Sequence, residues 1–398
     1  MSVKSTKNST KINKQGVSIV IGSRNEYPQV GMTICNLMED CYNSGIDNFE
    51  VILMDNGSED ETSRFFHWRP VNKSGWWKYI YSPRGLVHTR KLKIFFDPVL
   101  SNVGTRNKGV LRAKYENIIF SDAHIIVRPG TVESILTALN DFGGIIHTPV
   151  SWMGADGASP KPGYQYSYKV GEKIWGTWNK LKVADTPFYI PFCGHCFIAV
   201  KKKQFLEYRG YPYAQRVYGG GEPYLDTKWW MVGSHSMCDP NSLVYHLSAG
   251  RGYSYNQSDL IHNMFLVSYV LGGNKWIDRI LITYLNSSRF YAPSIKQLYE
   301  EAKMEAKEDK AWLDEHKIMT FEELLALGKP DDCTKCMKRG YPEPHAMRKW
   351  DLLNDKLHGT HRSYVQEFKL TKDKDGKIFI GRTPIINPEA IKIASKYL

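Results

Sequence analysis

Three short runs of apolar, largely β-branched residues are the feature that most constrains the fold of this 398-residue chain. They are Val17–Gly22, Phe49–Met54 and Asn117–Phe120, and a stretch with helical spacing from Pro28 to about Asn43 separates the first two. Continuous apolar runs of this length are typical of strands that are buried on both faces, as in a parallel sheet. The alternation therefore predicts an α/β fold, with helices on both faces of a mostly parallel sheet.

A polar cluster follows each of these runs. The clusters are Ser23–Glu26, Asp55–Ser58 and Asp122–His124. In open α/β sheets, ligands bind beyond the C-terminal ends of the strands, because loops and helix N-termini meet there. Three clusters on successive strands of one sheet therefore predict a single pocket.

Two of the polar segments indicate particular chemistry. A carboxylate and an imidazole, from Asp122 and His124, suit Mn²⁺ or a similar divalent ion. The alternative is that Asp122 caps the following segment and His124 is an ordinary hydrogen-bonded side chain. Later, Gly219–Gly221 precedes Glu222, and a glycine run requires backbone freedom or a close approach. The glycine run matches no phosphate-loop or dinucleotide motif. The alternative interpretation of the run is a glycine hairpin followed by an exposed glutamate.

Charge and composition limit the partners and the location. The chain has 53 basic and 41 acidic residues and a net charge of +12, which favours a polyanionic partner or, alternatively, only solubility. Residues 1–15 hold four lysines and no acid, and predict a disordered basic tail. There is no apolar stretch of eighteen residues, no signal core and no regular cysteine framework among the seven cysteines. These features predict a cytoplasmic protein without a membrane span.

Four segments resemble, in order and spacing, the nucleotide-sugar half of a GT-A glycosyltransferase of the large family 2. They are VSIVIGSRNE at Val17–Glu26, DNGSED at Asp55–Asp60, NVGTRNKG at Asn102–Gly109 and FSDAH at Phe120–His124. The resemblance implies a GT-A fold, with a Rossmann-like, mostly parallel mixed sheet that binds a nucleotide sugar.

Three later segments are similar to the polypeptide N-acetylgalactosaminyltransferase branch of the same fold. They are Phe192–Val200, Tyr218–Asp226 and Ser242–His246. That branch has Asp-x-His in place of Asp-x-Asp, a Gly-Gly-Glu helix and a late metal-binding histidine. The resemblance covers roughly residues 17–147 and 188–255. It implies a GT-A domain over 16–255, with 151–187 as an acceptor or lid loop, and a mostly helical extension over 256–398.

The resemblance also implies roles for individual residues. Asp122, His124 and His246 would hold Mn²⁺ or Mg²⁺ against the diphosphate of a nucleotide sugar, expected to be linked to UDP. For nucleotide-sugar binding, it implies contacts from Arg24, Asn25, Glu26, Asp55, Arg106, Asn107, Asp122, Gly220 and Gly221. Asp55 would contact the base or ribose, the Arg24–Glu26 turn the uridine, and Arg106 and Asn107 the diphosphate and sugar.

Glu222 and Asp226 are the candidate catalytic acids. The chain departs from the family here, because Pro223 follows Glu222 and Asp226 lies one position beyond the acid of the related branch. Cys193 and His195 also interrupt the usual glycine run. The identity of the base and the stereochemistry of transfer therefore stay open.

The acceptor is predicted from charge and from the segment 151–187, which combines lysines with aromatic residues. Its lysines could neutralise phosphates and its aromatic rings could stack on a base: Lys161, Lys169, Lys173, Lys180, Lys182, Tyr164, Tyr166, Tyr168, Trp175 and Trp178. These residues favour DNA, with a hydroxymethylated base as acceptor. The alternatives are that the aromatic residues line a sugar site or pack a lid, with a cell-envelope glycan or a protein as acceptor. A GT-A-fold binding protein without catalysis is a more distant alternative.

One further motif lies outside the resemblance. Cys333 and Cys336 are followed by His345 and then by His358 or His361, a pattern that could hold structural zinc.

Overall fold

The computed structural model describes residues 15–60, 62, 79–82, 85–88, 91–154, 157–158, 162–170, 174–180, 186–247, 254–287, 289–327, 365–367 and 369–398. The motif at Cys333, Cys336 and His345 lies outside these residues, as does most of the basic tail.

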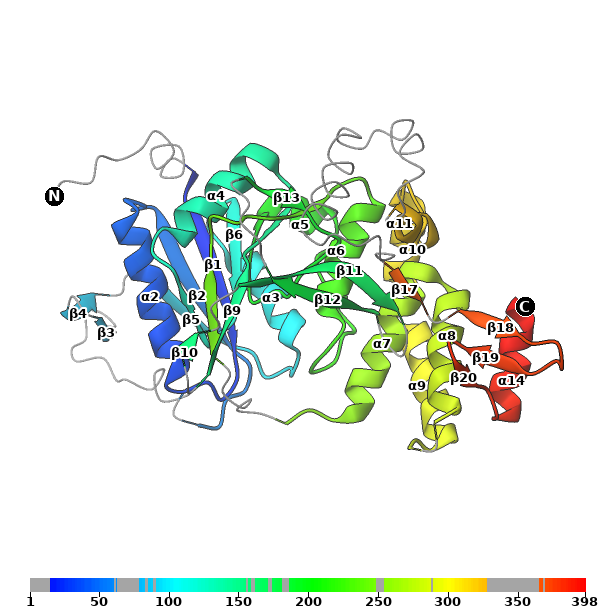
Figure 1. The fold of residues 1–398 in the computed structure, drawn as a ribbon. Coiled ribbons are helices and arrows are strands. Elements are labelled where there is room, and N and C mark those ends of the chain that lie inside the picture. Colours follow the sequence, from blue (N-terminus) through cyan, green and yellow to red (C-terminus); the bar gives the residue numbers. More distant parts are fainter. Residues whose placement is uncertain are drawn as a thin grey trace.

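An eight-stranded sheet forms the centre of the fold (Figure 1). In sheet order its strands are β13 (Phe188–Tyr189), β15 (Ser236–Cys238), β8 (Ile145–His147), β14 (Phe197–Lys201), β6 (Asn117–Ser121), β1 (Val17–Ser23), β2 (Phe49–Asp55) and β5 (Leu92–Phe96). β6, β1, β2 and β5 are mutually parallel, whereas β14 is antiparallel to both of its neighbours. This mixed sheet confirms the predicted fold class.

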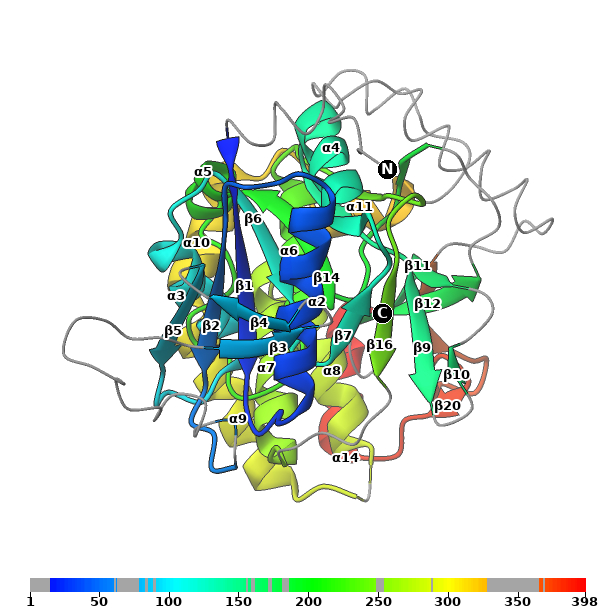
Figure 2. The same cartoon turned by 90° about the vertical axis from the view of Figure 1, so that its left-hand side faces the viewer.

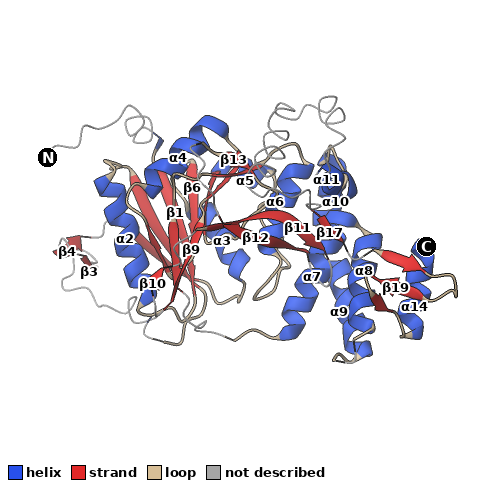
Figure 3. Ribbon diagram, viewed as in Figure 1, coloured by secondary structure: helices blue, strands red, loops and turns tan. Residues whose placement is uncertain are grey.

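Helices cover both faces of this sheet (Figures 2 and 3). They are α2 (Gln29–Asn43) and α4 (Thr131–Phe142) on one face, and α3 (Asn102–Arg112), α5 (Lys202–Glu207) and α6 (Gly221–Met231) on the other. Successive residues of a strand point to opposite faces, so Ile19 packs with α2 and α4 while Val20 packs with α3 and α6. A Cβ on Gly109 would lie 2.3 Å from Val20 Cγ1, so this glycine lets α3 approach the sheet closely.

A second sheet lies beside the first. Its strands are, in order, β12 (Ile174–Lys180), β11 (Gly163–Val170), β9 (Val150–Gly154), β16 (Val244–Leu247) and β7 (Ile125–Val127), with β10 (Gly157–Ala158) beside β9 and β17 (Val365–Glu367) beside β11. The described residues of segment 151–187, which was expected to be an acceptor or lid loop, thus consist largely of strands β9 to β12. Tyrosines 164, 166 and 168 alternate with polar residues, which is a strand pattern, but the glycines and prolines around them suggested a loop.

The described residues after 256 include several helices, as predicted. They are α7 (Gln257–Gly272), α8 (Asn274–Leu285), α9 (Ala292–Glu305), α10 (Lys307–His316), α11 (Phe321–Leu327), α14 (Pro388–Ala394) and η2 (Ser395–Tyr397). This part of the chain also contains a small sheet of β18 (Leu370–Lys372), β19 (Ile378–Ile380) and β20 (Thr383–Pro384). Elsewhere in the chain, β3 (Tyr79–Ser82) pairs with β4 (Gly85–His88). Helices α7 to α11 and α14 share one apolar core with Tyr224, Trp230 and Met231 of α6, so the C-terminal extension packs directly on α6.

Among the described residues, no helix combines the length and the apolar character that are needed to cross a bilayer.

Candidate functional site

A cavity of about 400 Å³ lies where the parallel strands end. The turn after β1, the end of β2 and the segment between β6 and β7 line one part of it, and the start of α6 and strand β16 line another. This is the edge at which the polar clusters were predicted to meet. The topology of the sheet thus brings segments that are far apart in the sequence into one pocket.

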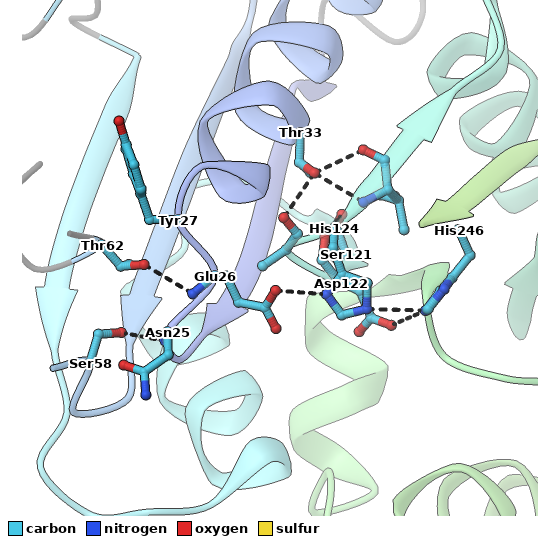
Figure 4. A network of polar contacts seen from close by, with 12 residues as sticks. Asn25, Glu26, Tyr27, Thr33, Ser58, Thr62, Ser121, Asp122, His124 and His246 are labelled. Atoms are coloured by element: carbon cyan, nitrogen blue, oxygen red, sulfur yellow. Dashed lines mark hydrogen bonds and ion pairs between the residues drawn. The ribbon is translucent and has the colours of Figure 1, made fainter. Parts of the chain in front are cut away.

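Asp122, His124 and His246 converge in this cavity (Figure 4). The two Nε2 atoms of His124 and His246 lie 3.2 Å apart, and Nε2 of His246 is 3.6 Å from Oδ2 of Asp122. The side chains are between buried and exposed, so a ligand in the cavity can reach them. The three residues predicted from separate segments therefore form one cluster.

The spacing of this cluster fits a divalent ion. With metal–ligand bonds of about 2.1 Å, neighbouring ligands of a tetrahedral or octahedral ion lie roughly 3.0 to 3.4 Å apart. The two imidazole nitrogens fall in this range, and the carboxylate oxygen is slightly beyond it. Nδ1 of His246 has no hydrogen-bond partner among the described residues. The donor set and its geometry fit Mn²⁺ or a similar ion.

Residues behind the cluster orient His124. Oε2 of Glu26 lies 3.1 Å from Nδ1 of His124 (Figure 4). A carboxylate accepts, so the ring hydrogen is placed on Nδ1 and the lone pair of Nε2 faces His246. Thr33 on α2 fixes the backbone beside it, because its hydroxyl lies 2.9 Å and 2.8 Å from the carbonyl oxygens of Ala123 and Ile125.

Arg106 holds Asp122 from the other side. Nη2 of Arg106, on α3, donates to Oδ1 of Asp122 over 2.8 Å, and the arginine side chain is only 6% exposed. Burial alone would raise the pKa of Asp122, but the hydrogen bond with His246 and the charge of Arg106 hold it well below its ordinary value. Asp122 is therefore an anion, and its carboxylate can bind a metal ion while it accepts the hydrogen bond from the guanidinium of Arg106.

The structure places the predicted site residues in two groups. Those that line the cavity are Arg24, Glu26, Arg106, Asp122, His124, Gly221, Glu222 and His246. Those that do not line it are Asn25, Asp55, Asn107, Gly220 and Asp226.

The second group supports the cavity from behind. Asn25 accepts from the backbone N–H of Glu59, and Asp55 accepts from the hydroxyl and the N–H of Ser58. Asn107 binds the backbone of Tyr211 through both ends of its amide. Gly220, with a φ of 81°, begins helix α6 in a conformation that favours glycine. In this structure these residues shape turns; none presents a polar side chain to the cavity.

Asp226 corrects one of the predicted catalytic roles. Its side chain is fully buried, and each carboxylate oxygen already contacts an imidazole, from His147 at 2.6 Å and from His195 at 2.5 Å. A carboxylate that is enclosed in this way does not contact a substrate. The acid lies on the inner face of α6, whereas Glu222 lies at the start of that helix and lines the cavity.

Several cavity residues were not singled out from the sequence. Trp152, 45% exposed, places its ring 4.7 Å from that of His246, and Tyr218 lies 4.7 Å from Tyr255, ring centre to ring centre. Tyr211 and Arg216 also line the cavity. The only signal for Trp152 was its place at the start of the aromatic segment. Tyr218 begins one of the segments that carry the resemblance, whereas nothing in the local sequence marked Tyr211 or Arg216.

Comparison with known proteins supports the fold. Neither a protein-family model nor a curated protein matches the chain. Among solved structures, the chain is similar to GalNAc-T7 with UDP, GalNAc and Mn²⁺, at 16% identity over 82% of this chain and 58% of that chain, with a TM-score of 0.54. The chain thus spans 58% of the length of that protein. This similarity shows that the chain has the GT-A glycosyltransferase fold.

Two further structures are more distantly similar. One is the mannosyltransferase PcManGT from Pyrobaculum calidifontis with GDP-Man and Mn²⁺, at 15% identity over 86% of this chain and 84% of that chain, with a TM-score of 0.39. The other is S. aureus TarS 1–349 with UDP-GlcNAc, at 13% identity over 93% of this chain and 99% of that chain, with a TM-score of 0.42.

Proposed function

We propose that the protein is a metal-dependent glycosyltransferase that moves a sugar from a nucleotide sugar, linked to UDP, to an acceptor. The observation that carries this proposal is the convergence of Asp122, His124 and His246, at the spacing of a divalent ion, inside the cavity of a GT-A fold. The expected ion is Mn²⁺ or Mg²⁺. When bound, it would supply positive charge that stabilises the departing diphosphate.

The residues around the cluster suit a diphosphate. Arg106 lines the cavity and is held in place by Asp122, so its guanidinium is fixed before a ligand enters. Guanidinium groups bind phosphate oxygens strongly because both the charge and the hydrogen-bond geometry match. Arg24 lines the same cavity, in the turn after β1.

Glu222 is the acid that we assign to the reacting end of the cavity. It lies in the first turn of α6 and lines the same cavity as Arg106 and Tyr211. In an inverting enzyme Glu222 would accept the acceptor proton; in a retaining enzyme it would position the sugar.

For the acceptor we propose a polyanion, with a hydroxymethylated base in DNA as the first candidate. This part of the proposal depends on the net charge of +12 and on the lysines and aromatic residues of 151–187. A cell-envelope glycan is the second candidate, because the exposed ring of Trp152 beside the metal cluster suits the face of a sugar equally well.

The test is a hydrolysis and transfer screen with UDP-linked and GDP-linked sugars, with Mn²⁺ and with chelator. Each donor is offered with hydroxymethylated DNA, unmodified DNA or an envelope glycan. We expect Mn²⁺-dependent release of the nucleoside diphosphate, lost in His246→Ala, and transfer to one acceptor only. The absence of any Mn²⁺-dependent release across the donor panel would contradict the proposed activity.

Salt dependence separates the two acceptors. If the protein makes about six phosphate contacts, raising the salt concentration from 50 to 200 mM should weaken DNA binding by roughly three orders of magnitude. Fluorescence anisotropy of labelled DNA measures this slope. A DNA affinity that does not change with salt concentration would exclude DNA as the acceptor and leave the cell-envelope glycan as the candidate.

A further inference from the structure

Among the described residues, a second group of one aspartate and two histidines lies behind the first. It consists of His147, at the end of β8, His195, before β14, and Asp226, on α6. All three side chains are at most 1% exposed. The group therefore has the same composition as the cavity cluster but is almost entirely buried, and of its three residues only His195 is part of the cavity lining.

Its spacing is that of hydrogen bonds and not of metal ligands. The carboxylate of Asp226 lies 2.6 Å from Nε2 of His147 and 2.5 Å from Nε2 of His195. Two ligands of one ion would lie roughly 3.0 to 3.4 Å apart. Both distances are slightly shorter than the roughly 2.7 to 2.9 Å of charge-assisted N–H···O⁻ hydrogen bonds and well below the spacing of metal ligands, so the ring hydrogens occupy both contacts. Nδ1 of His147 finds no partner in the described part of the chain, which suits a lone pair better than an N–H.

These contacts continue to the cavity as one chain of hydrogen bonds. Because Asp226 accepts from Nε2 of His195, Nδ1 of that neutral ring is an acceptor, and it lies 2.7 Å from the hydroxyl of Tyr211. The Tyr211 hydroxyl then donates to His195 and accepts from Nη1 of Arg106 over 3.4 Å. Arg106 ends the chain with its hydrogen bond to Asp122. The direction of each hydrogen bond follows from the carboxylate of Asp226.

The protonation states agree with this direction. Burial lowers the pKa of His195 to about 4, despite the neighbouring carboxylate, so the ring is neutral near pH 7. Burial would raise the pKa of Asp226, but His147 and His195 lower it to about 2, so the carboxylate is ionised. Burial also raises the pKa of Tyr211, which keeps the proton that it donates.

We propose that Tyr211, His195 and Asp226 are positioning residues that fix the guanidinium of Arg106 for the diphosphate of the donor. The inference depends on the proposed function, because it assigns the ligand that Arg106 binds. An arginine side chain loses much rotational freedom when it is held in one geometry. Contacts to Asp122 and Tyr211 remove that freedom before the ligand enters, so less affinity is lost on binding. His195 and Asp226, two residues at which the chain departs from the related family, would then act together to position Arg106.

The test measures binding of UDP and of GDP, in the presence of Mn²⁺, by isothermal titration calorimetry. Tyr211→Phe removes one hydroxyl, and we expect about a 3- to 10-fold loss of diphosphate affinity, the usual effect of one hydrogen bond. Asp226→Asn should give a similar loss, because an amide cannot accept from both imidazoles. Affinity for Mn²⁺ alone should stay within about twofold in Tyr211→Phe, because the hydroxyl does not contact the cation cluster.

A double-mutant cycle tests whether Tyr211 acts through Arg106. In an Arg106→Lys background, Tyr211→Phe should have little further effect. The control is Tyr299→Phe, which removes another buried hydroxyl, one that donates to Asp278 over 2.6 Å in the C-terminal helices. It should lower stability without changing diphosphate affinity. Additive losses in the cycle, or an equal loss in Tyr299→Phe, would overturn the positioning role.

A spectroscopic measurement is independent of any ligand. Nitrogen chemical shifts of ¹⁵N-histidine, assigned with His195→Gln, should show the Nε2–H tautomer of His195 across neutral pH in the wild-type protein. An Nδ1–H tautomer would reverse the chain and overturn the inference. If the wild-type protein binds neither UDP nor GDP, the proposed function fails. If it binds one of them and Tyr211→Phe binds equally well, only the positioning role fails.

Discussion

Oε2 of Glu26 lies 3.1 Å from Nδ1 of His124, so a carboxylate in the cavity wall determines which nitrogen of the imidazole faces the metal cluster. The sequence had associated Glu26 with uridine binding. Its contact with His124 adds a second candidate role, that of a carboxylate that orients a metal-binding histidine.

Glu26→Gln should therefore weaken Mn²⁺ binding by about 10- to 100-fold, because the ring loses its charged acceptor. Calorimetric titration of the purified protein with Mn²⁺ measures this loss. Glu207→Gln, on the exposed surface of α5, removes the same charge and serves as the control. Equal affinities in wild type and Glu26→Gln would show that Glu26 does not orient the ligand.

His246→Ala should abolish the Mn²⁺-induced rise in melting temperature and leave the fold intact. The ring lies at the end of a strand, with its side chain 17% exposed, and contributes little to the core. A ligand that binds only the folded state raises its stability, so loss of the rise reports loss of binding. His316→Ala, in exposed α10, should retain the full rise. A normal Mn²⁺ response in His246→Ala would remove His246 from the site.

Glu222→Gln should lower the transfer rate by about 10²- to 10⁴-fold if Glu222 is the base, the usual contribution of a positioned base. Affinity for UDP with Mn²⁺ should not fall, because the amide has the same size. Product anomer analysis by NMR separates a base in an inverting enzyme from a positioning group in a retaining one. Unchanged turnover would exclude both roles.

Lys228 predicts a pH dependence of stability. Its ammonium is buried, donates to the carbonyl of Gly210 and lies over the Tyr224 ring, at 4.6 Å from the centroid. Burial lowers its pKa to about 7, with Asp309 opposing and Arg209 adding to the shift. The folded state then binds fewer protons than the unfolded state above that pKa, so stability rises with pH until the unfolded pKa is reached.

The free energy of unfolding, measured with urea, is compared for the wild-type protein and Lys228→Met at two pH values. Between about pH 7 and about pH 9.5, the difference between the two proteins should change by about 3 kcal/mol in favour of the wild type. Methionine keeps the length of the side chain without the charge. The comparison of two proteins at each pH cancels the titration of other groups. Parallel stability curves for the two proteins would show that Lys228 does not titrate near neutrality.

The parts of the fold that could be predicted are those that local sequence determines. The runs at β1, β2 and β6 are mostly apolar because both faces of the sheet are covered, and the polar residues that follow them mark the strand ends. Asp122 and His124 were visible for this reason, and His246 through the resemblance. The hairpin of β11 and β12 could not be predicted from the sequence, because its glycines and lysines mask the alternating pattern of a strand.

The network behind the cavity could not be predicted for a different reason. His147, His195 and Asp226 come from three separated segments, and each alone has the composition of an ordinary polar position. Only the crossing of β8, β14 and α6 brings them together. The burial of Lys228 likewise depends on contacts with α10, a helix far along the chain, whose Trp312 ring lies 5.8 Å from the ammonium.

The pairing of β16 with β7 makes the site dependent on spacing as well as on residue type. His246 is opposite Ile125 in this antiparallel pair, and the N–H of Leu247 donates to the carbonyl of His124. Because side chains alternate along a strand, deletion or insertion of one residue within β16, before His246, would turn the histidine to the opposite face. A related chain could keep every cavity residue and still lose the cluster through one such length change. Evolution of this site is therefore expected to tolerate substitution beside His246 more readily than a change in length.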